Sequence, residues 1–319
     1  MGAPSRTRKT LCWATAAATV PYLTIKVLWI CGSHLGMTDP GQLDTPTYRA
    51  ANAVTLLLDA AVVVIALALA YDWGRRVPAW CILPPMWVAT GLLAPIVVLL
   101  PLAAPAAGDR GSGSTADALA GWVYAVVYGG FTLQGLLIVA AFVFYARRRW
   151  PAALDGSVPD RSALLPVQRF VAVVLAALAA VVAGLNLAWA LGGTAGLGAL
   201  ADRQNTVDRA TLGVYALFAA ATAVGLPALV AGRPARWPSW PALALTWFGS
   251  GAMVTWGLYL LTIATNDPSL TSPGMNLAVA VKVMVGAAAA VLGLIVVAER
   301  VGTRPATDDD RSYLATALR

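Results

Sequence analysis

The chain alternates between long apolar runs and short polar connections. Each run has about 20 residues or more, the length of α-helix that crosses the hydrocarbon core of a bilayer. Tryptophans lie near the ends of these runs, as aromatic belts at a membrane interface require. The pattern therefore predicts an all-α, polytopic integral membrane protein with eight transmembrane helices. We expect them at residues 11–32, 50–71, 79–102, 118–146, 167–192, 208–231, 239–264 and 274–298.

The basic residues are distributed unequally between the two sides of these spans. An even number of spans puts both termini on one side, and 16 of the 22 Lys and Arg lie there. On the other side lie Arg49, Arg110, Arg203 and Arg209. The positive-inside rule then predicts that both termini are cytoplasmic. This orientation accounts for the net charge of +7, so we expect no binding to nucleic acid.

The composition supports a membrane protein and narrows its source. The chain is 59% hydrophobic and only 12% charged, which is not the composition of a soluble globular domain. Its richness in alanine and its use of arginine over lysine indicate a high-GC bacterium, so we expect the bacterial plasma membrane. The sequence has no phosphate-binding GxxxxGK[ST] loop, and we expect no nucleotide hydrolysis.

The two halves of the chain match each other at a fixed shift of 160 residues. Such self-similarity is typical of a duplication. The matched pairs are Trp29 with Trp189, Gly32 with Gly192, Gly36 with Gly196, Arg49 with Arg209, Arg76 with Arg236, Pro78 with Pro238, Trp80 with Trp240, Trp87 with Trp247 and Gly91 with Gly251.

The repeat predicts how the domains are organised. We expect a four-helix membrane repeat at 1–150, a cytoplasmic linker at 151–166, a second four-helix repeat at 167–300 and a disordered cytoplasmic tail at 301–319. Because each half has an even number of spans, the two repeats run in the same direction through the membrane. Their symmetry would be a two-fold axis along the membrane normal, as in some transporters. A duplication that only builds a stable bundle is the alternative.

Three ionisable residues lie inside the predicted spans, where charge is costly and usually functional. They are Lys26 in the first span, Asp59 in the second and Lys282 in the eighth. At about 1.5 Å per residue, all three fall within about 9–14 Å of the outer boundary of the bilayer. Their shared depth predicts a polar cavity between the halves that opens outward, with small Ala278 and Gly286 leaving room beside Lys282.

Helical spacing places further polar side chains near these charges. Tyr22 and Lys26 share one stripe of the first span, Tyr128 belongs to a tyrosine stripe of the fourth, and Asn186 occupies the position of Lys26 in the second repeat. Aromatic and polar stripes in the sixth and seventh spans include Asp208, Thr211, Tyr215, Thr222, Trp256 and Tyr259. The ligand-binding residues that we predict are Lys282, Lys26, Asp59, Asn186, Tyr22 and Tyr128.

Lys26 and Asp59 differ from Lys282 in the partners that the sequence offers them. On adjacent helices, Lys26 and Asp59 can form an ion pair, which would serve structure or would gate or carry protons. Lys26 could also extend its ammonium to the outer interface. Lys282 has no further acid deep within the spans to pair with, because Asp59 is the only one. An unpaired ammonium in the membrane either gives up its proton or attracts an anion.

Three functions remain open at this point. The first is a transporter or permease for a small anionic or amphipathic molecule. The second is a membrane-integrated enzyme of specialised metabolism, of cyclase or transferase type, with Asp59 and Lys26 as acid and base. The third is an accessory or sensor subunit.

The partners that we expect are the lipid bilayer and a small-molecule ligand, and the oligomeric state, including a homo-oligomer, stays open. We expect no cofactor and no metal, because His34, the only histidine, has only the scattered Asp39 and Asp44 nearby.

Overall fold

A computed structural model of the chain describes residues 6–39, 41, 46–103, 119–155, 164–231, 239–266 and 268–302. These ranges contain eight α-helices that are long and apolar enough to cross a membrane, which confirms the predicted number and class of spans. Each helix overlaps its predicted span over most of its length. The helices are α1 (Arg6–Ile30), α3 (Pro46–Ala70), α4 (Ala79–Ala103), α5 (Gly121–Arg149), α7 (Leu165–Ala190), α8 (Thr206–Ala231), α9 (Trp240–Asn266) and α10 (Pro273–Gly302).

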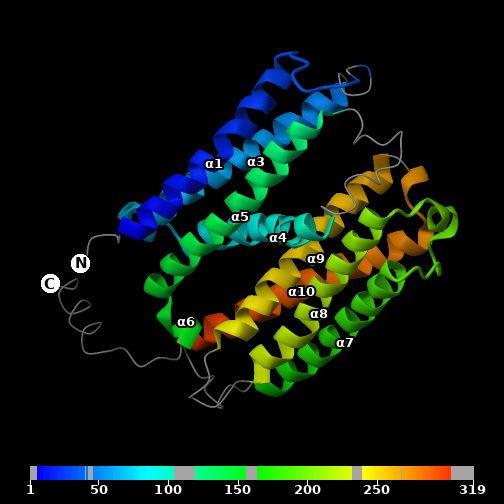
Figure 1. Cartoon of the computed structure of the whole chain (residues 1–319). Coiled ribbons are helices and arrows are strands. Elements are labelled where there is room, and N and C mark those ends of the chain that lie inside the picture. The colour runs from blue at the N-terminus through cyan, green and yellow to red at the C-terminus, as the bar shows by residue number, and fades with distance from the viewer. Residues whose placement is uncertain are drawn as a thin grey trace.

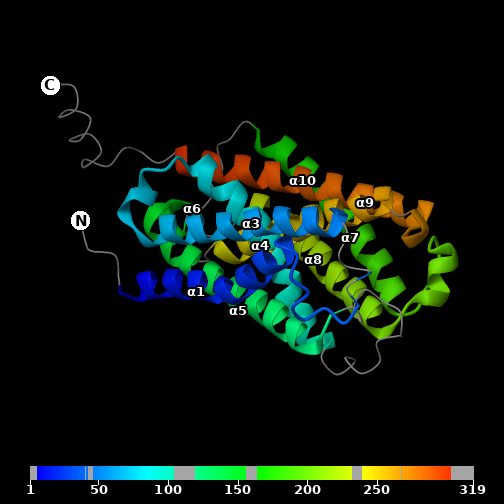
Figure 2. The ribbon, with the colours of Figure 1, turned by 90° about the horizontal axis from the view of Figure 1, so that it is seen from above.

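The helices pack in two groups that α4 connects. Helices α1, α3 and α5 lie together, and α7, α8, α9 and α10 form the second group. Helix α4 crosses between them, against α5 on one side and against α8 and α9 on the other (Figures 1 and 2). It contains Pro84, Pro85, Pro95 and Pro101. Membrane helices tolerate such residues where neighbouring helices satisfy the backbone groups that proline frees.

The short connections are held by specific hydrogen bonds. The range that we predicted as a linker begins with a short helix, α6 (Pro151–Asp155). The Ser239 hydroxyl donates to its Ala153 and Leu154 carbonyls at 3.2 and 2.8 Å. At the same end, the Arg149 guanidinium donates to the Gly74 carbonyl at 3.0 Å and so fixes the α3–α4 connection. The predicted tail from residue 303 onward lies outside the described residues.

Two turns at equivalent positions of the halves have the same geometry. The indole of Trp29 donates to the Leu35 carbonyl at 2.8 Å, and the indole of Trp189 donates to the Ala195 carbonyl at 2.7 Å. Two residues after each preceding helix comes a glycine with positive φ, +87° at Gly32 and +98° at Gly192, as is common just past helix C-termini. The two turns, which lie 160 residues apart, therefore have the same pattern of hydrogen bonds. The duplication itself stays a prediction.

The contact between α4 and α9 is reciprocal in that same register. The Trp87 indole donates to the Ser250 hydroxyl at 3.1 Å, and the Trp247 indole donates to the Thr90 hydroxyl at 2.9 Å. Between these bonds a Cβ atom built on Gly91 would lie 2.5 Å from the Gly251 carbonyl carbon. Small residues allow such close approach of membrane helices. A self-complementary contact of this kind is typical of a two-fold interface.

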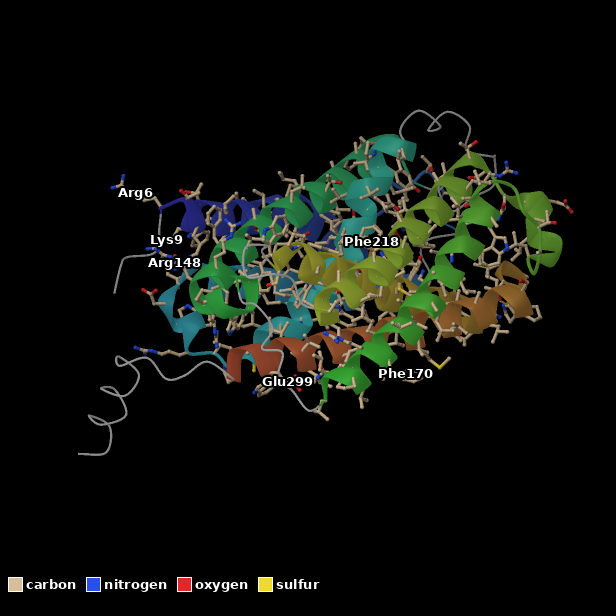
Figure 3. All side chains as sticks on the ribbon, turned by 90° about the horizontal axis from the view of Figure 1, so that it is seen from below. Arg6, Lys9, Arg148, Phe170, Phe218 and Glu299 are labelled. Carbon is tan, nitrogen blue, oxygen red and sulfur yellow. The ribbon has the colours of Figure 1, made fainter. Side chains whose placement is uncertain are left out.

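The basic ends of two helices lie at one end of the molecule. Figure 3 shows Arg6 and Lys9, at the start of α1, on the same side as Arg148, near the end of α5. This is the arrangement that an even number of crossings between them requires.

We expect Gly91→Ala to destabilise the protein, because the new methyl group would press on the backbone of Gly251. Overpacking of this kind costs about 1–3 kcal/mol, which thermal unfolding of the purified protein in detergent would measure. Gly184→Ala is the matched control, since a Cβ atom there meets no atom within 4 Å. Equal melting temperatures for the two variants would contradict the close contact of α4 with α9.

Candidate functional site

The first buried charge pair joins α1 to α3. The Lys26 ammonium lies 2.6 Å from a carboxylate oxygen of Asp59, and the two residues are 0% and 7% exposed. This confirms the ion pair that the sequence offered as an alternative. Because each charge lies within hydrogen-bond distance of the other, the pair offsets part of the cost of burying either one alone.

Aromatic rings complete the surroundings of Lys26. Its Nζ lies 3.9 Å from the centroid of the Tyr22 ring, a cation–π contact between two residues of one helix stripe. Tyr22 in turn packs edge-on against Phe131, with 4.8 Å between the ring centroids. The centroids of Phe131 and Tyr128 are 6.5 Å apart, also edge-on. Tyr22 therefore touches the charge directly, whereas Tyr128 lies beyond the Phe131 ring and is 40% exposed.

Lys282 on α10 is buried without a charge partner. It is 3% exposed, and within the described ranges its ammonium has neither a hydrogen-bond acceptor nor an acid within 4.0 Å. Its Nζ lies 3.7 Å from the centroid of the Tyr215 ring on α8. Tyr215 was not among the residues we predicted to bind a ligand, although it belongs to a polar stripe of the sixth span.

A small cavity of about 10 Å³ lies beside Lys282. It has room for roughly one water molecule. Its walls come from α7, α8, α9 and α10, so it lies inside the second group of helices, and Lys26 and Asp59 do not line it. This differs from the shared cavity between the halves that we expected. The lining residues are Asn186, Trp189, Leu212, Tyr215, Leu260, Met275, Ala278, Val279 and Lys282.

The small residues around Lys282 have different roles. Ala278 lines the cavity, as expected. Gly286 does not leave room there, because a Cβ atom on it would lie 2.9 Å from the Met253 Cβ atom of α9. It serves close packing of α10 on α9. Asn186 lines the cavity and donates one amide hydrogen to the Val182 carbonyl at 2.8 Å.

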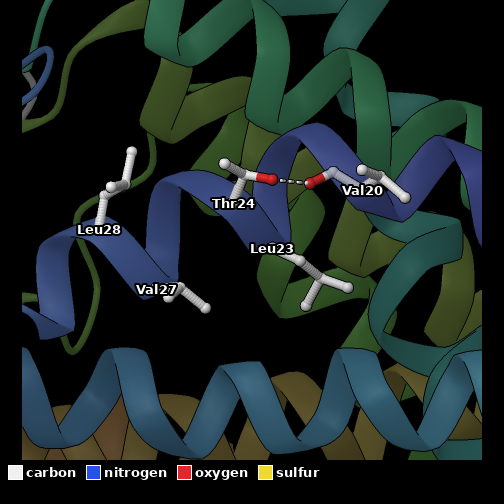
Figure 4. Close-up of a pocket in the computed structure, with 5 residues that line it drawn as sticks. All are labelled: Val20, Leu23, Thr24, Val27 and Leu28. Carbon is white, nitrogen blue, oxygen red and sulfur yellow. Dashed lines mark hydrogen bonds between the residues drawn. The ribbon is translucent and has the colours of Figure 1, made fainter.

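A larger hollow, of about 310 Å³, lies along α1 (Figure 4). Its walls are Val20, Leu23, Thr24, Val27 and Leu28, and the Thr24 hydroxyl donates to the Val20 carbonyl at 2.8 Å. No charged side chain lines it. A shallow apolar groove on a membrane helix suits lipid, so the chemistry favours the smaller cavity as the candidate site.

His34 and Asp39, which we considered as metal ligands, do not form a metal site in the described part of the chain. In the ranges that the structure covers, no three His, Cys, Asp or Glu side chains come together to hold a metal ion. Asp44, which we considered with His34 and Asp39, lies outside those ranges.

We expect Lys26→Met and Asp59→Leu each to destabilise the protein, because each leaves one buried charge without its partner. Breaking a buried pair typically costs about 3–5 kcal/mol, whereas replacing both partners by apolar residues is often neutral. Thermal unfolding in detergent of both single variants and the double variant tests this. Single-variant losses that simply add in the double variant would argue against a coupled pair.

Comparison of the chain with protein-family models, with curated proteins and with solved structures gave no match. The two buried lysines therefore provide the chemical basis for a proposed function.

Proposed function

We propose that this protein is a membrane transporter for a small anionic or amphipathic molecule, with Lys282 as the charge that binds the ligand. The single observation that carries the proposal is the ammonium of Lys282, which lies beside a cavity and has no hydrogen-bond acceptor among the described residues. A buried cation without an internal counter-charge is costly, and proteins keep such residues in membranes mainly for function.

The surroundings of Lys282 suit an amphipathic ligand. Leu212, Leu260, Met275 and Val279 supply apolar walls, and Asn186 supplies an amide next to the charge. A site with one charged anchor in apolar surroundings is typical of small-molecule binding. The cavity holds only about one water in this conformation, so entry of a ligand requires the helices to separate, as alternating access demands.

The wider architecture is part of the same proposal. We propose that the eight helices form two parallel repeats in a bacterial plasma membrane, with both termini cytoplasmic. The reciprocal α4–α9 contact and the equivalent turns after Trp29 and Trp189 support the repeat. The polar ends of α1 and α5 on one side support the orientation (Figure 3). In this scheme, Lys26 and Asp59 couple α1 to α3 and respond to movement between them.

The runner-up is an enzyme that uses Asp59 and Lys26 as acid and base. The 2.6 Å contact between the two groups is the observation in its favour, since proton transfer needs such proximity. Against it, Lys26 is 0% exposed and both groups are engaged with each other, so a substrate would first have to part them. Product formation by the purified protein in detergent, without any gradient, would support this alternative.

We expect Lys282→Ala to abolish anion uptake while the protein still inserts into membranes. Loss of one partner of a buried charge contact costs about 2–5 kcal/mol, so uptake should fall at least about 30-fold. Proteoliposomes loaded with wild type or variant would be tested with radiolabelled lactate, benzoate, phosphate and sulfate. Lys9→Ala is the control, because Lys9 lies in the first turn of α1 and does not line the cavity. Unchanged uptake in Lys282→Ala would contradict the proposal.

We also expect the cavity to be reached from outside the cell during the transport cycle. In a chain whose Cys12, Cys31 and Cys81 have been replaced, Ala278→Cys should react with a membrane-impermeant thiol reagent added outside. Ala289→Cys is the control, because Ala289 is fully buried in the core of the second group. Labelling of neither position, or of both equally, would argue against an outward-opening cavity.

A further inference from the structure

The two halves bury one lysine each, in comparable surroundings. Lys26 lies against the Tyr22 ring at 3.9 Å and Lys282 against the Tyr215 ring at 3.7 Å. The register fixed by Trp29 and Trp189 aligns Lys26 with Asn186, which lines the cavity at Lys282. The second half thus carries its cation on α10 and an amide at the position where the first half has its lysine.

The halves differ in the counter-charge. In the 160-residue register, Asp59 aligns with Ala219, which is 0% exposed. Ala219 lies one turn after Tyr215 on α8 and packs in the same buried cluster as Val285, which is one turn after Lys282 on α10. In this register the second half has a methyl group at the position of Asp59 and the amide of Asn186 at the position of Lys26. Lys282 comes from a different helix, α10, and has no hydrogen-bond acceptor among the described residues.

We propose that the Lys282 cavity binds one monocarboxylate, whose carboxylate takes the place beside Lys282 that the Asp59 carboxylate has beside Lys26. This inference rests on the proposed transport function and names its class of substrate. In the first half, the negative charge that neutralises the lysine belongs to the chain itself. In the second half, the bound ligand would supply it.

The charges at the site favour a monoanion. Lys282 is the only cation among the lining residues, so one negative charge neutralises the site. A phosphate, with a charge of about −1.5 to −2 at neutral pH, would leave an excess of negative charge in a poorly solvated place. Asn186 carries a second amide hydrogen besides the one given to Val182, and it can donate to the other carboxylate oxygen.

The remaining walls favour an apolar body on that carboxylate. Leu212, Leu260, Met275 and Val279 offer no hydrogen bond to a polar ligand, and the Trp189 indole is already bound to the Ala195 carbonyl. Tyr215 presents its ring to Lys282, and its hydroxyl is the one further polar group of the lining. Desolvating a polar body there would cost free energy without compensation. A small aliphatic or aromatic acid suits these apolar walls once the helices have separated to admit it, and benzoate is a convenient probe.

The test is to give the second half its own carboxylate. In Ala219→Asp the new side chain would compete with the ligand for Lys282, and in Ala219→Asn a side chain of nearly the same size would bring no charge. Benzoate binding to the detergent-purified protein would be titrated by tryptophan fluorescence. We expect benzoate to bind wild type saturably. The affinity should fall at least about tenfold in Ala219→Asp and in Lys282→Met, because these two variants neutralise or remove the free positive charge. It should change less than about threefold in Ala219→Asn, which keeps that charge.

The outcomes separate this inference from the proposed function. If acetate displaces benzoate in a competition experiment and phosphate fails to displace it, the result supports a monocarboxylate. Stronger binding of phosphate or chloride that still depends on Lys282 would overturn it and leave an anion transporter. Equal binding by Ala219→Asp and Ala219→Asn would overturn the placement of the carboxylate. Absence of binding by any of these anions, together with unchanged uptake in Lys282→Ala, would overturn both. If Ala219→Asp fails to fold, the Lys282→Met titration and the competition still decide the ligand class.

Discussion

A lysine ammonium in the hydrocarbon core of a membrane needs compensation, and the two buried lysines of this protein receive it in different ways. Lys26 has an acid at 2.6 Å and a tyrosine ring at 3.9 Å. Among the residues that the structure describes, Lys282 has the ring alone. A cation–π contact is worth about 2 kcal/mol or more when desolvated, which is less than the several kcal/mol that burying an ion costs. The imbalance at Lys282 makes it the chemically unusual point of the described structure.

The packing of α4 against α9 depends on two glycines, which have no side chains at the point of contact. Gly91 and Gly251 let α4 and α9 meet backbone to backbone, and a tryptophan on each side donates to a hydroxyl on the other. Since lipid offers no hydrophobic force between helices, such close contacts and hydrogen bonds carry the association. Trp256 adds a third indole bond, to the Leu92 carbonyl at 3.1 Å.

The sequence was sufficient for features that depend on length or on local spacing. Eight apolar runs predicted eight helices, and charges on neighbouring spans predicted the pair of Lys26 with Asp59. The rotation and tilt of each helix could not be predicted, because packing against neighbours sets them. For that reason we missed the ring of Tyr215 under Lys282 and expected Gly286 to border a cavity instead of α9. The same uncertainty led us to expect one cavity between the halves, where the structure has a small one within the second group.

The reciprocal contact of α4 with α9 has a consequence for how this molecule can vary. In a symmetric dimer of identical chains, every substitution would appear on both sides of the axis. Here one chain supplies both sides, so Thr90 accepts one indole bond while its counterpart Ser250 accepts the other. A single substitution can change one half and leave its counterpart intact. Such a chain is free to keep a neutralised lysine for stability in one half and to leave the other lysine chemically available.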